Sequence, residues 1–211
     1  MPQSCSYDMK VLPSSRSCKL QLTNASGRTV LVEIIFGVQQ GDWDLFLSSE
    51  GRDDIFLIPS TIWPESYAVA EAKFFSHVAR QAPRNSFHLQ CLQVWASILE
   101  GTDFTTYTLK TVVMHLLATT PLSGWRRRDF LPRLEDIMQF LRCCLEDKCL
   151  NHFFFGNENV PEEIILPPPF KTAKPYNLFY HLLHYPADHA QALRDYMVLQ
   201  DRLITLLYYG H

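Results

Sequence analysis

The sequence predicts an α+β protein in which a small antiparallel β region, residues 1–60, precedes a mainly helical lobe, residues 61–211. Between residues 17 and 40, apolar and β-branched residues recur with the alternation of strands around a polar turn. After Pro59 the apolar residues recur at spacings of three and four instead, which is typical of amphipathic helices. Because a two-stranded hairpin is barely stable alone, the β region is expected to be the edge of a larger sheet or to lean on the helices.

The predicted hairpin has one strand around residues 18–22, a turn at 24–28 and a return strand at 29–36. The return strand is apolar on both faces, which predicts that it is buried. Two further apolar runs, 45–47 and 55–58, are short enough to be either edge strands or packed loop segments.

Five helices are expected in the lobe. The first begins at Pro64, since proline is favoured in the first turn of a helix, and runs for about five turns to near Pro83. The second ends at Gly101, and the third ends before Pro121. Each has apolar residues on one side, so each is predicted to pack that face against the others.

The fourth expected helix carries apolar residues from Phe130 to Leu145, and the last carries them from Ala192 onward. One stripe of the last helix is predicted to belong to the core, and it comprises Leu199, Leu203, Leu206 and Leu207. The segment 156–175 is expected to be a proline-rich loop, because the three prolines 167–169 are excluded from helix interiors.

Composition excludes several classes of protein. Disorder is not expected, because 47% of the residues are hydrophobic and can form a substantial core. With 19 basic against 22 acidic residues, the net charge of -3 offers no broad attraction for nucleic acid or anionic lipid. The apolar stretches are too short to span a bilayer, and no signal peptide is visible. The six cysteines are sparse and irregular, so we expect reduced thiols.

Several stretches of the chain resemble a known family. Residues 107–115, Trp125 and segments 134–145 and 150–154 are similar in order and spacing to the C-terminal signature of the male-abnormal (Mab) superfamily. Segments 36–42, 174–179 and 199–211 resemble its inositol trisphosphate receptor-interacting branch. The likeness covers residues 18–211, nearly the whole chain.

This superfamily is related to cyclic GMP-AMP synthase, whose nucleotidyltransferase sheet precedes a helical lobe. The resemblance therefore implies that the chain is a C-terminal portion, that residues 1–60 are the remnant of such a sheet, and that residues 61–211 are a Mab-type helical domain. It also implies that strand 30–35 corresponds to the one bearing the third catalytic carboxylate, which makes Glu33 a vestigial metal position.

The residues present do not predict catalysis. Nucleotidyl transfer on two Mg²⁺ ions needs two carboxylates on one strand, a third opposite and a Gly-Ser turn. Asp42 and Asp44 have the spacing of such a pair, but they follow Gly41 in an expected turn and no Gly-Ser loop precedes them. Two solvated aspartates in a turn are the favoured interpretation, and no catalytic residue or cofactor is expected.

Two cysteine patterns have the residue types of a chemical site, although a plain packing role is favoured for both. The set Cys143, Cys144, Cys149 and His152 invites a zinc site, but adjacent cysteines on a helix diverge by about 100°, so thiols without metal are favoured. Cys91 lies three residues after His88, yet no third catalytic partner is evident, and Cys91 is predicted to belong to the core.

The one local basic patch is the run Arg126, Arg127 and Arg128, with Lys110 and Arg133 as candidate neighbours. It is a candidate anion patch for the phosphate groups of RNA, an inositol phosphate or lipid, although a solvated face before a helix is the favoured interpretation. The histidines at 181, 184 and 189 fit neither a standard zinc motif nor a triad, so structural or surface roles are expected.

The leading functional hypothesis is a non-catalytic regulatory module, in which the proline-rich loop 157–169 offers a protein partner an exposed surface. The resemblance implies the inositol trisphosphate receptor or another membrane receptor as partner, a role in calcium signalling, and a membrane anchor N-terminal to this otherwise soluble chain. No nucleic acid is expected. The alternative is a nucleotidyltransferase-like enzyme or nucleotide sensor whose catalytic half lies outside the chain.

Overall fold

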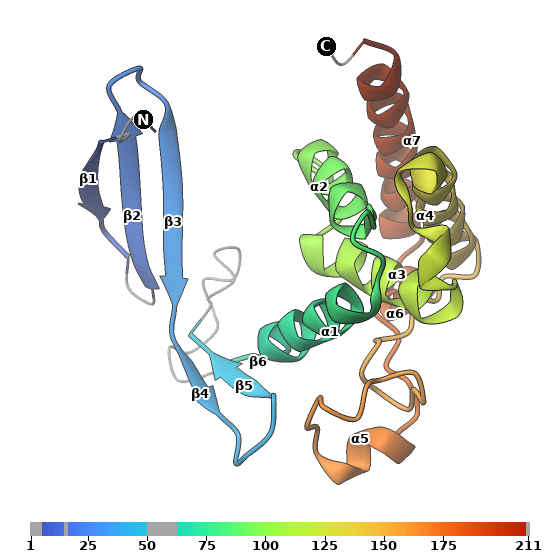
Figure 1. Cartoon of the computed structure of the whole chain (residues 1–211). Helices are drawn as coiled ribbons and strands as arrows, with labels where there is room; N and C mark the ends of the chain where they lie inside the picture. The colour runs from blue at the N-terminus through green and yellow to red at the C-terminus, as the bar shows by residue number, and fades with distance from the viewer. Residues whose placement is uncertain (1–5, 15–16, 50–62, 210–211) are drawn as a thin grey trace. The chain divides into compact units, whose positions relative to one another are not determined.

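A computed structural model describes residues 6–14, 17–49 and 63–209 (Figure 1). The chain divides into two compact units, Met1–Ala72 and Lys73–His211. The described strands all lie in the first unit, and the second is mainly helical, which confirms the α+β class. The expected short segment at 55–58 and the predicted domain boundary at residue 60 lie outside the described residues.

Three strands form an antiparallel sheet in the order β1-β2-β3: β1 spans Tyr7–Leu12, β2 spans Ser17–Asn24 and β3 spans Thr29–Ile35 (Figure 1). The predicted hairpin of β2 and β3 is confirmed. Asn24 closes its turn, because its side-chain oxygen accepts hydrogen bonds from the backbone N–H groups of Ser26 and Arg28. The sequence analysis missed β1, although Met9 and Val11 alternate with polar residues.

The prediction that β3 is buried is wrong for this chain. Leu31 is 70% exposed, and Val30, Ile34 and Ile35 are also exposed. Apolar residues on both faces are typical of a strand in a sheet that is covered on both sides. The described residues of this chain do not bury either face of β3.

A second antiparallel sheet, in the order β4-β5-β6, comprises Gly37–Gln39, Phe46–Ser48 and Glu65–Ser66. The expected short strand at 45–47 is therefore present, shifted by one residue. The predicted helix start at Pro64 is wrong, because the Pro64 carbonyl accepts a hydrogen bond from Ser48 N at 2.8 Å in this strand pairing. The helix α1 begins later and has 14 residues, Ala68–Gln81, or about four turns instead of five.

The other long helices agree closely with the sequence expectation: α2 is His88–Ile98, α3 is Thr106–Thr119, α4 is Phe130–Glu146 and α7 is Pro186–Tyr209. Short helical turns lie between them, and these are η1 at Leu122–Gly124, η2 at Arg127–Asp129, α5 at Pro168–Thr172 and α6 at Tyr180–His184. The segment 156–175 is thus not wholly a loop. Pro168 and Pro169 occupy the first turn of α5, where the missing N–H costs no helical hydrogen bond.

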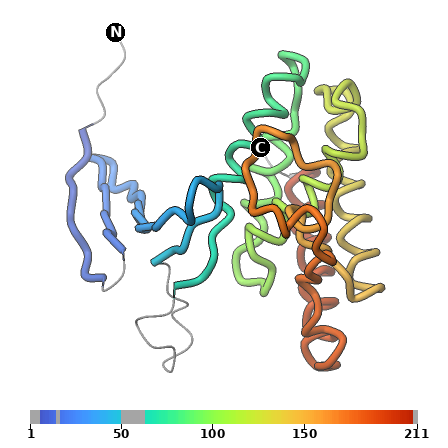
Figure 2. Tube along the Cα trace, turned by 90° about the horizontal axis from the view of Figure 1, so that it is seen from below, coloured from blue at the N-terminus to red at the C-terminus, as the bar shows by residue number. Residues whose placement is uncertain are grey.

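The core of the helical unit lies where α2, α3, α4 and α7 pack against one another, and Figures 1 and 2 show α4 and α7 side by side. Leu199 and Leu203 of α7 are buried, which confirms their predicted place in the core. The same prediction is wrong for Leu206 and Leu207, which are 38% and 44% exposed. Neighbouring elements cover the apolar stripe as far as Leu203 and leave the final turn open.

Candidate functional site

Two of the motif segments that carry the family resemblance lie side by side in the helical unit. Asn151 and Asn177 form an antiparallel bridge between them. On either side, His152 N donates to Tyr176 O at 2.7 Å, and Leu178 N donates to Leu150 O at 2.7 Å. The motifs at 150–154 and 174–179 therefore form one structural element, although residues 155–173 separate them in sequence.

The Asn177 side chain holds this element to the end of α4. Its oxygen accepts hydrogen bonds from Leu150 N and Phe179 N, both at 2.9 Å, and its nitrogen donates to the Lys148 carbonyl at 2.9 Å. Lys148 has a φ of 51°, the left-handed conformation that commonly ends a helix. Asn177 is thus a structural residue that satisfies three backbone groups at once.

His152 is a neutral, buried member of the same element. Its Nδ1 accepts a hydrogen bond from Phe154 N, so the ring carries its proton on Nε2 and donates it to the Tyr107 hydroxyl oxygen. Burial lowers the pKa of His152 to about 4. His115 donates from Nε2 to Asn151 O at 2.8 Å, and burial lowers its pKa as well. Both histidines tie α3 to this motif in their uncharged form.

The cysteines of the candidate zinc pattern do not share one environment. Cys143 and Cys149 are exposed, whereas Cys144 is buried, and burial raises the pKa of the Cys144 thiol to about 12. His152 engages Tyr107 with the nitrogen that carries the proton. Among the residues that the structure describes, no three His, Cys, Asp or Glu side chains form a group that could hold a metal ion.

Cys91 is fully buried, and burial raises the pKa of its thiol to about 12. A nucleophilic cysteine requires the thiolate, which a raised pKa disfavours. His88 pairs through Nδ1 with the Ser86 hydroxyl at 2.8 Å, and burial lowers its pKa. This environment is that of a core thiol.

The carboxylates of the first unit lie in surroundings unlike a two-metal site. Glu33 accepts a hydrogen bond from the Ser17 hydroxyl and lies 3.4 Å from Lys19 Nζ, and these contacts, the Ser17 bond above all, lower its pKa. Asp42 and Asp44 follow Gly41 through a turn and not along a strand. The expectation that both are solvated is wrong for Asp44, which is buried.

The predicted basic run lies beside the start of α2. Arg126 forms an antiparallel bridge with Ser86, and Phe87 N donates to Trp125 O at 2.6 Å. Arg126 is half-buried, while Arg127 and Arg128 are exposed. The guanidinium of Arg133, a predicted neighbour, lies 5.9 Å from the centre of the Trp125 ring.

The three histidines near the C-terminal end have surface or structural positions. His181 and His184 on α6 are exposed. His189 Nε2 donates to Leu145 O at 2.9 Å and so connects α7 to α4. These positions agree with the expected structural or surface roles.

A surface groove of about 410 Å³ lies in the helical unit. The second half of α1, the end of α3 and the loop after Gly156 form its walls. The lining residues are Phe74, His77, Val78, Gln81, Leu117, Ala118, Thr119, Thr120, Pro121, Leu122, Asn159 and Pro161. Sequence reasoning missed this groove, because its walls come from three separate segments.

Contacts within the helical unit hold the loop wall of the groove in place. Glu163 accepts from both His77 Nδ1 and Arg80, and His77 Nε2 contacts Gln81 Nε2 at 2.7 Å. Ile164 is only 3% exposed, and it anchors the loop just after these polar contacts. The groove is therefore a preformed feature of the fold.

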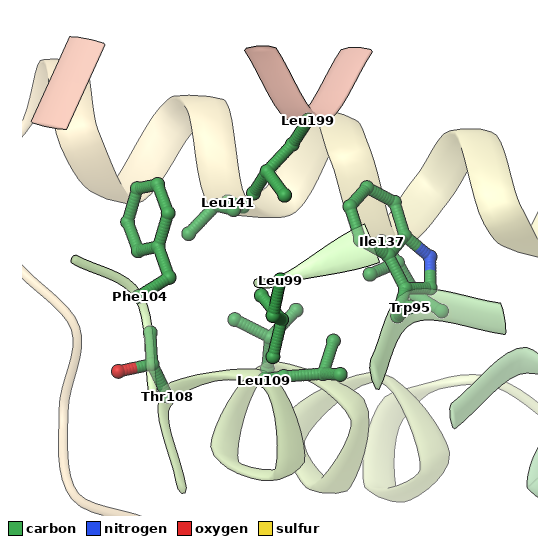
Figure 3. A pocket seen from close by; sticks show the side chains of 9 residues that line it. Trp95, Leu99, Phe104, Thr108, Leu109, Ile137, Leu141 and Leu199 are labelled. Atoms are coloured by element: carbon green, nitrogen blue, oxygen red, sulfur yellow. The ribbon is translucent and has the colours of Figure 1, made fainter. Parts of the chain in front are cut away.

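A second, much smaller hollow of about 10 Å³ lies in the core (Figure 3). Its walls are the apolar side chains of four helices and the segment before α3, together with Thr108 (Figure 3). A space of this size is at the lower limit for one water molecule, and an apolar lining offers water few partners. It is a small packing gap and not a ligand site.

No helix within the described part of the chain combines the length and the apolar character that a membrane span requires. The long helix α7 carries Arg194, Asp195, Asp201 and Arg202, among other polar residues.

Comparison with known proteins agrees with the resemblance of the motifs. The family model for the Mab-21 protein HhH/H2TH-like domain matches residues 89–164. Inositol 1,4,5-trisphosphate receptor-interacting protein-like 1 of Rattus norvegicus is 37% identical over 95% of this chain, and the protein of that name from Mus musculus is 38% identical over the same share. The inositol 1,4,5-trisphosphate receptor-interacting protein of Homo sapiens is 34% identical over 76% of the chain.

The chain spans well under half the length of these relatives, 38% of the two like-1 proteins and 31% of the human protein. The matched family model covers the helices α2, α3 and α4 and the loop wall of the groove. On this evidence the chain belongs to the inositol 1,4,5-trisphosphate receptor-interacting protein family, within the Mab superfamily.

Proposed function

We propose that the chain is a non-catalytic interaction module that binds a segment of a protein partner in the groove between α1, α3 and the loop after Gly156. The preformed groove of about 410 Å³ is the observation that carries this proposal. It combines apolar walls, such as Phe74 and Leu117, with the polar groups of Gln81 and Asn159. Such a mixture suits a peptide, whose side chains need apolar contact and whose backbone needs hydrogen bonds.

The names of the relatives support a receptor as the partner. Several of them are called inositol 1,4,5-trisphosphate receptor-interacting proteins, and they are 33% to 36% identical to this chain over the matched residues. We therefore take that receptor, or another membrane receptor, as the partner, with modulation of its calcium signalling as the consequence. In this proposal a membrane anchor outside the present chain holds the module beside its partner.

The surroundings of the candidate catalytic residues also favour a role in binding over a role in catalysis. The Glu33 carboxylate is engaged by Ser17 and Lys19, and burial raises the pKa of the Cys91 thiol far from a nucleophile's range. In this proposal residues 1–60 are part of a nucleotidyltransferase-like sheet without catalytic function. Residues 61–211 are the Mab-type domain that carries the binding groove.

Filling the groove tests the proposal. Asn159 lines the groove, and Glu158 is its exposed neighbour outside the lining. Asn159→Trp should reduce binding of the purified chain to the purified receptor, measured by biolayer interferometry, by at least about tenfold, since a filled pocket removes a buried contact. Glu158→Trp adds the same bulky side chain one residue away and should bind as the unmodified chain does.

The melting temperature of each variant shows whether the fold is intact. It should be unchanged, because neither substitution removes a buried side chain. Equal binding of both variants and the unmodified chain would exclude the groove as the contact surface. Absence of any binding by the unmodified chain would exclude this receptor as a direct partner of the module.

A further inference from the structure

Five arginines are carried by the segments that meet at the start of α2 and the start of α4, and we refer to them as the arginine cluster. They are Arg84, Arg126, Arg127, Arg128 and Arg133. The bridge between Ser86 and Arg126 places the turn that carries Arg84, from a different part of the sequence, beside the segment that carries the next three. This concentration of positive charge contrasts with the net charge of -3 for the chain.

Acidic groups compensate only part of the arginine cluster. Arg133 pairs with Asp136 at 2.8 Å, and Arg128 lies 3.7 Å from Asp129. Arg84, Arg126 and Arg127 make no ion pair with any residue that the structure describes. Three guanidinium groups are thus available to an anion, and two of them, Arg126 and Arg127, are adjacent in the chain.

Buried nitrogen atoms without hydrogen-bond partners lie among the same residues. They are Trp125 Nε1, Arg126 Nε and Arg133 Nε, with His88 Nε2 close to the Ser86–Arg126 bridge. Trp125 is only 1% exposed, so its N–H is withdrawn from bulk solvent without an acceptor among the described residues. Buried donors without partners destabilise a fold unless an acceptor reaches them, and an anion at this place would supply acceptor oxygens.

We propose that the arginine cluster binds a phosphate monoester, with Arg126 and Arg127 as its main contacts. A guanidinium group offers paired N–H donors that match two phosphate oxygens, and the bond between opposite charges is stronger than a neutral one. A monoester carries close to two negative charges and three acceptor oxygens. It therefore matches several unpaired cations and donors better than a carboxylate, which has one charge and two oxygens.

The phosphate group has two sources, a soluble phosphorylated molecule or the headgroup of a phospholipid. Glycerol 3-phosphate, a soluble phosphate monoester, is the first probe, and vesicles of phosphatidylcholine with a minor fraction of phosphatidic acid are the lipid probe. Both are applied to the whole chain at low ionic strength, because screening weakens contacts between exposed charges. Calorimetry follows the first and vesicle co-sedimentation the second.

Arg126→Gln and Arg127→Gln should each weaken binding by about tenfold or more, which is the loss expected for one charged hydrogen bond. Arg127 is exposed, so its replacement leaves the packing of the fold intact. Arg142→Gln is the matched control, since Arg142 lies on α4 too but pairs with Glu146 at 2.8 Å and stands outside the cluster. The control should bind as the unmodified chain does.

Binding of either probe that is weakened about tenfold or more in both cluster variants and kept in the control supports the proposal, and the probe that binds identifies the source. Equal binding by all variants would overturn it, as would the absence of binding to both probes. A single-stranded RNA homopolymer serves as a third arm. If RNA alone binds, and the cluster variants abolish it, the surface recognises a nucleic acid backbone and the phosphate monoester site is excluded.

Discussion

Acidification to about pH 5 should destabilise the helical unit, and His152 should be a main cause. Its side chain is 4% exposed, and its Nδ1 is already occupied as an acceptor from Phe154 N. Burial therefore lowers its pKa from 6.5 to about 4, with the nearby His115 as a smaller cause. Protonation would place an unpaired charge in the interior and break the bond with Phe154 N.

The sign of the effect follows from proton binding. An unfolded His152 takes up a proton below about pH 6.5, whereas the folded one remains neutral until about pH 4. The unfolded state thus binds more protons within this window, so the free energy of unfolding falls as the pH falls through it. A pKa difference of roughly 2.5 corresponds to about 3 kcal/mol in total, of which about 2 kcal/mol is lost by pH 5.

Urea unfolding at about pH 7.5 and about pH 5, followed by helical circular dichroism, measures this loss. His152→Gln should be less stable at the higher pH, because it disturbs a buried hydrogen-bonded position, but it should lose about 2 kcal/mol less on acidification. The pKa values of His88 and His115 are also lowered by burial, so some pH dependence should remain in this variant.

His184→Gln is the control, because His184 is exposed on α6 and should leave the pH dependence of the unmodified chain unchanged. If His152→Gln loses as much stability on acidification as the unmodified chain, the reasoning about His152 is refuted. The same holds if the unmodified chain shows no loss between the two pH values.

Three further outcomes are expected from the packing. Leu203→Ala should lower the free energy of unfolding by about 2 to 5 kcal/mol, because Leu203 is only 6% exposed. Leu207 is 44% exposed, so Leu207→Ala should lower it by less than about 1 kcal/mol in the same urea titration. Gly156→Ala should lower the melting temperature by several degrees, since its φ is 56° and an added Cβ would clash with the backbone carbonyl oxygen of Ala173. An unchanged melting temperature would contradict that clash. Iodoacetamide should label the exposed Cys143 in the folded chain, as measured by peptide mass spectrometry. Cys144 should react only after urea is added, because burial raises its thiol pKa to about 12. Labelling of Cys144 without urea would contradict its burial.

Most helix positions in the helical unit can be predicted from the spacing of apolar residues. The helices α2, α3 and α4 were predicted within a few residues, because each has apolar groups at helical spacing and a clear stop, as at Gly101 with its φ of 71°. The start of α1 was not predictable in the same way. Proline is favoured in the first turn of a helix, but the Pro64 carbonyl accepts a hydrogen bond from Ser48 of strand β5. The residues around Pro64 in the sequence do not indicate this partner.

The candidate sites likewise combine features that the sequence shows with features that only the tertiary structure shows. The run Arg126 to Arg128 is visible in the sequence, but the bridge to Ser86 that adds Arg84 is a product of the tertiary structure. The groove is harder still to foresee, since it joins α1, α3 and a loop that lie far apart along the chain. The motif at 174–179 can be recognised by resemblance, while its structural role appears only when Asn177 is seen bonded to Lys148 and Leu150.

The sequence by itself determined the α+β class, the hairpin of β2 and β3, most helix positions and the family. These properties depend on the spacing of apolar residues and on motifs, both of which are visible in the sequence. The tertiary structure alone decided which apolar residues are buried, because burial depends on what packs against a face. That is why Leu199 lies in the core while Leu207, in the same stripe, is exposed, and why the apolar strand β3 is open in this chain.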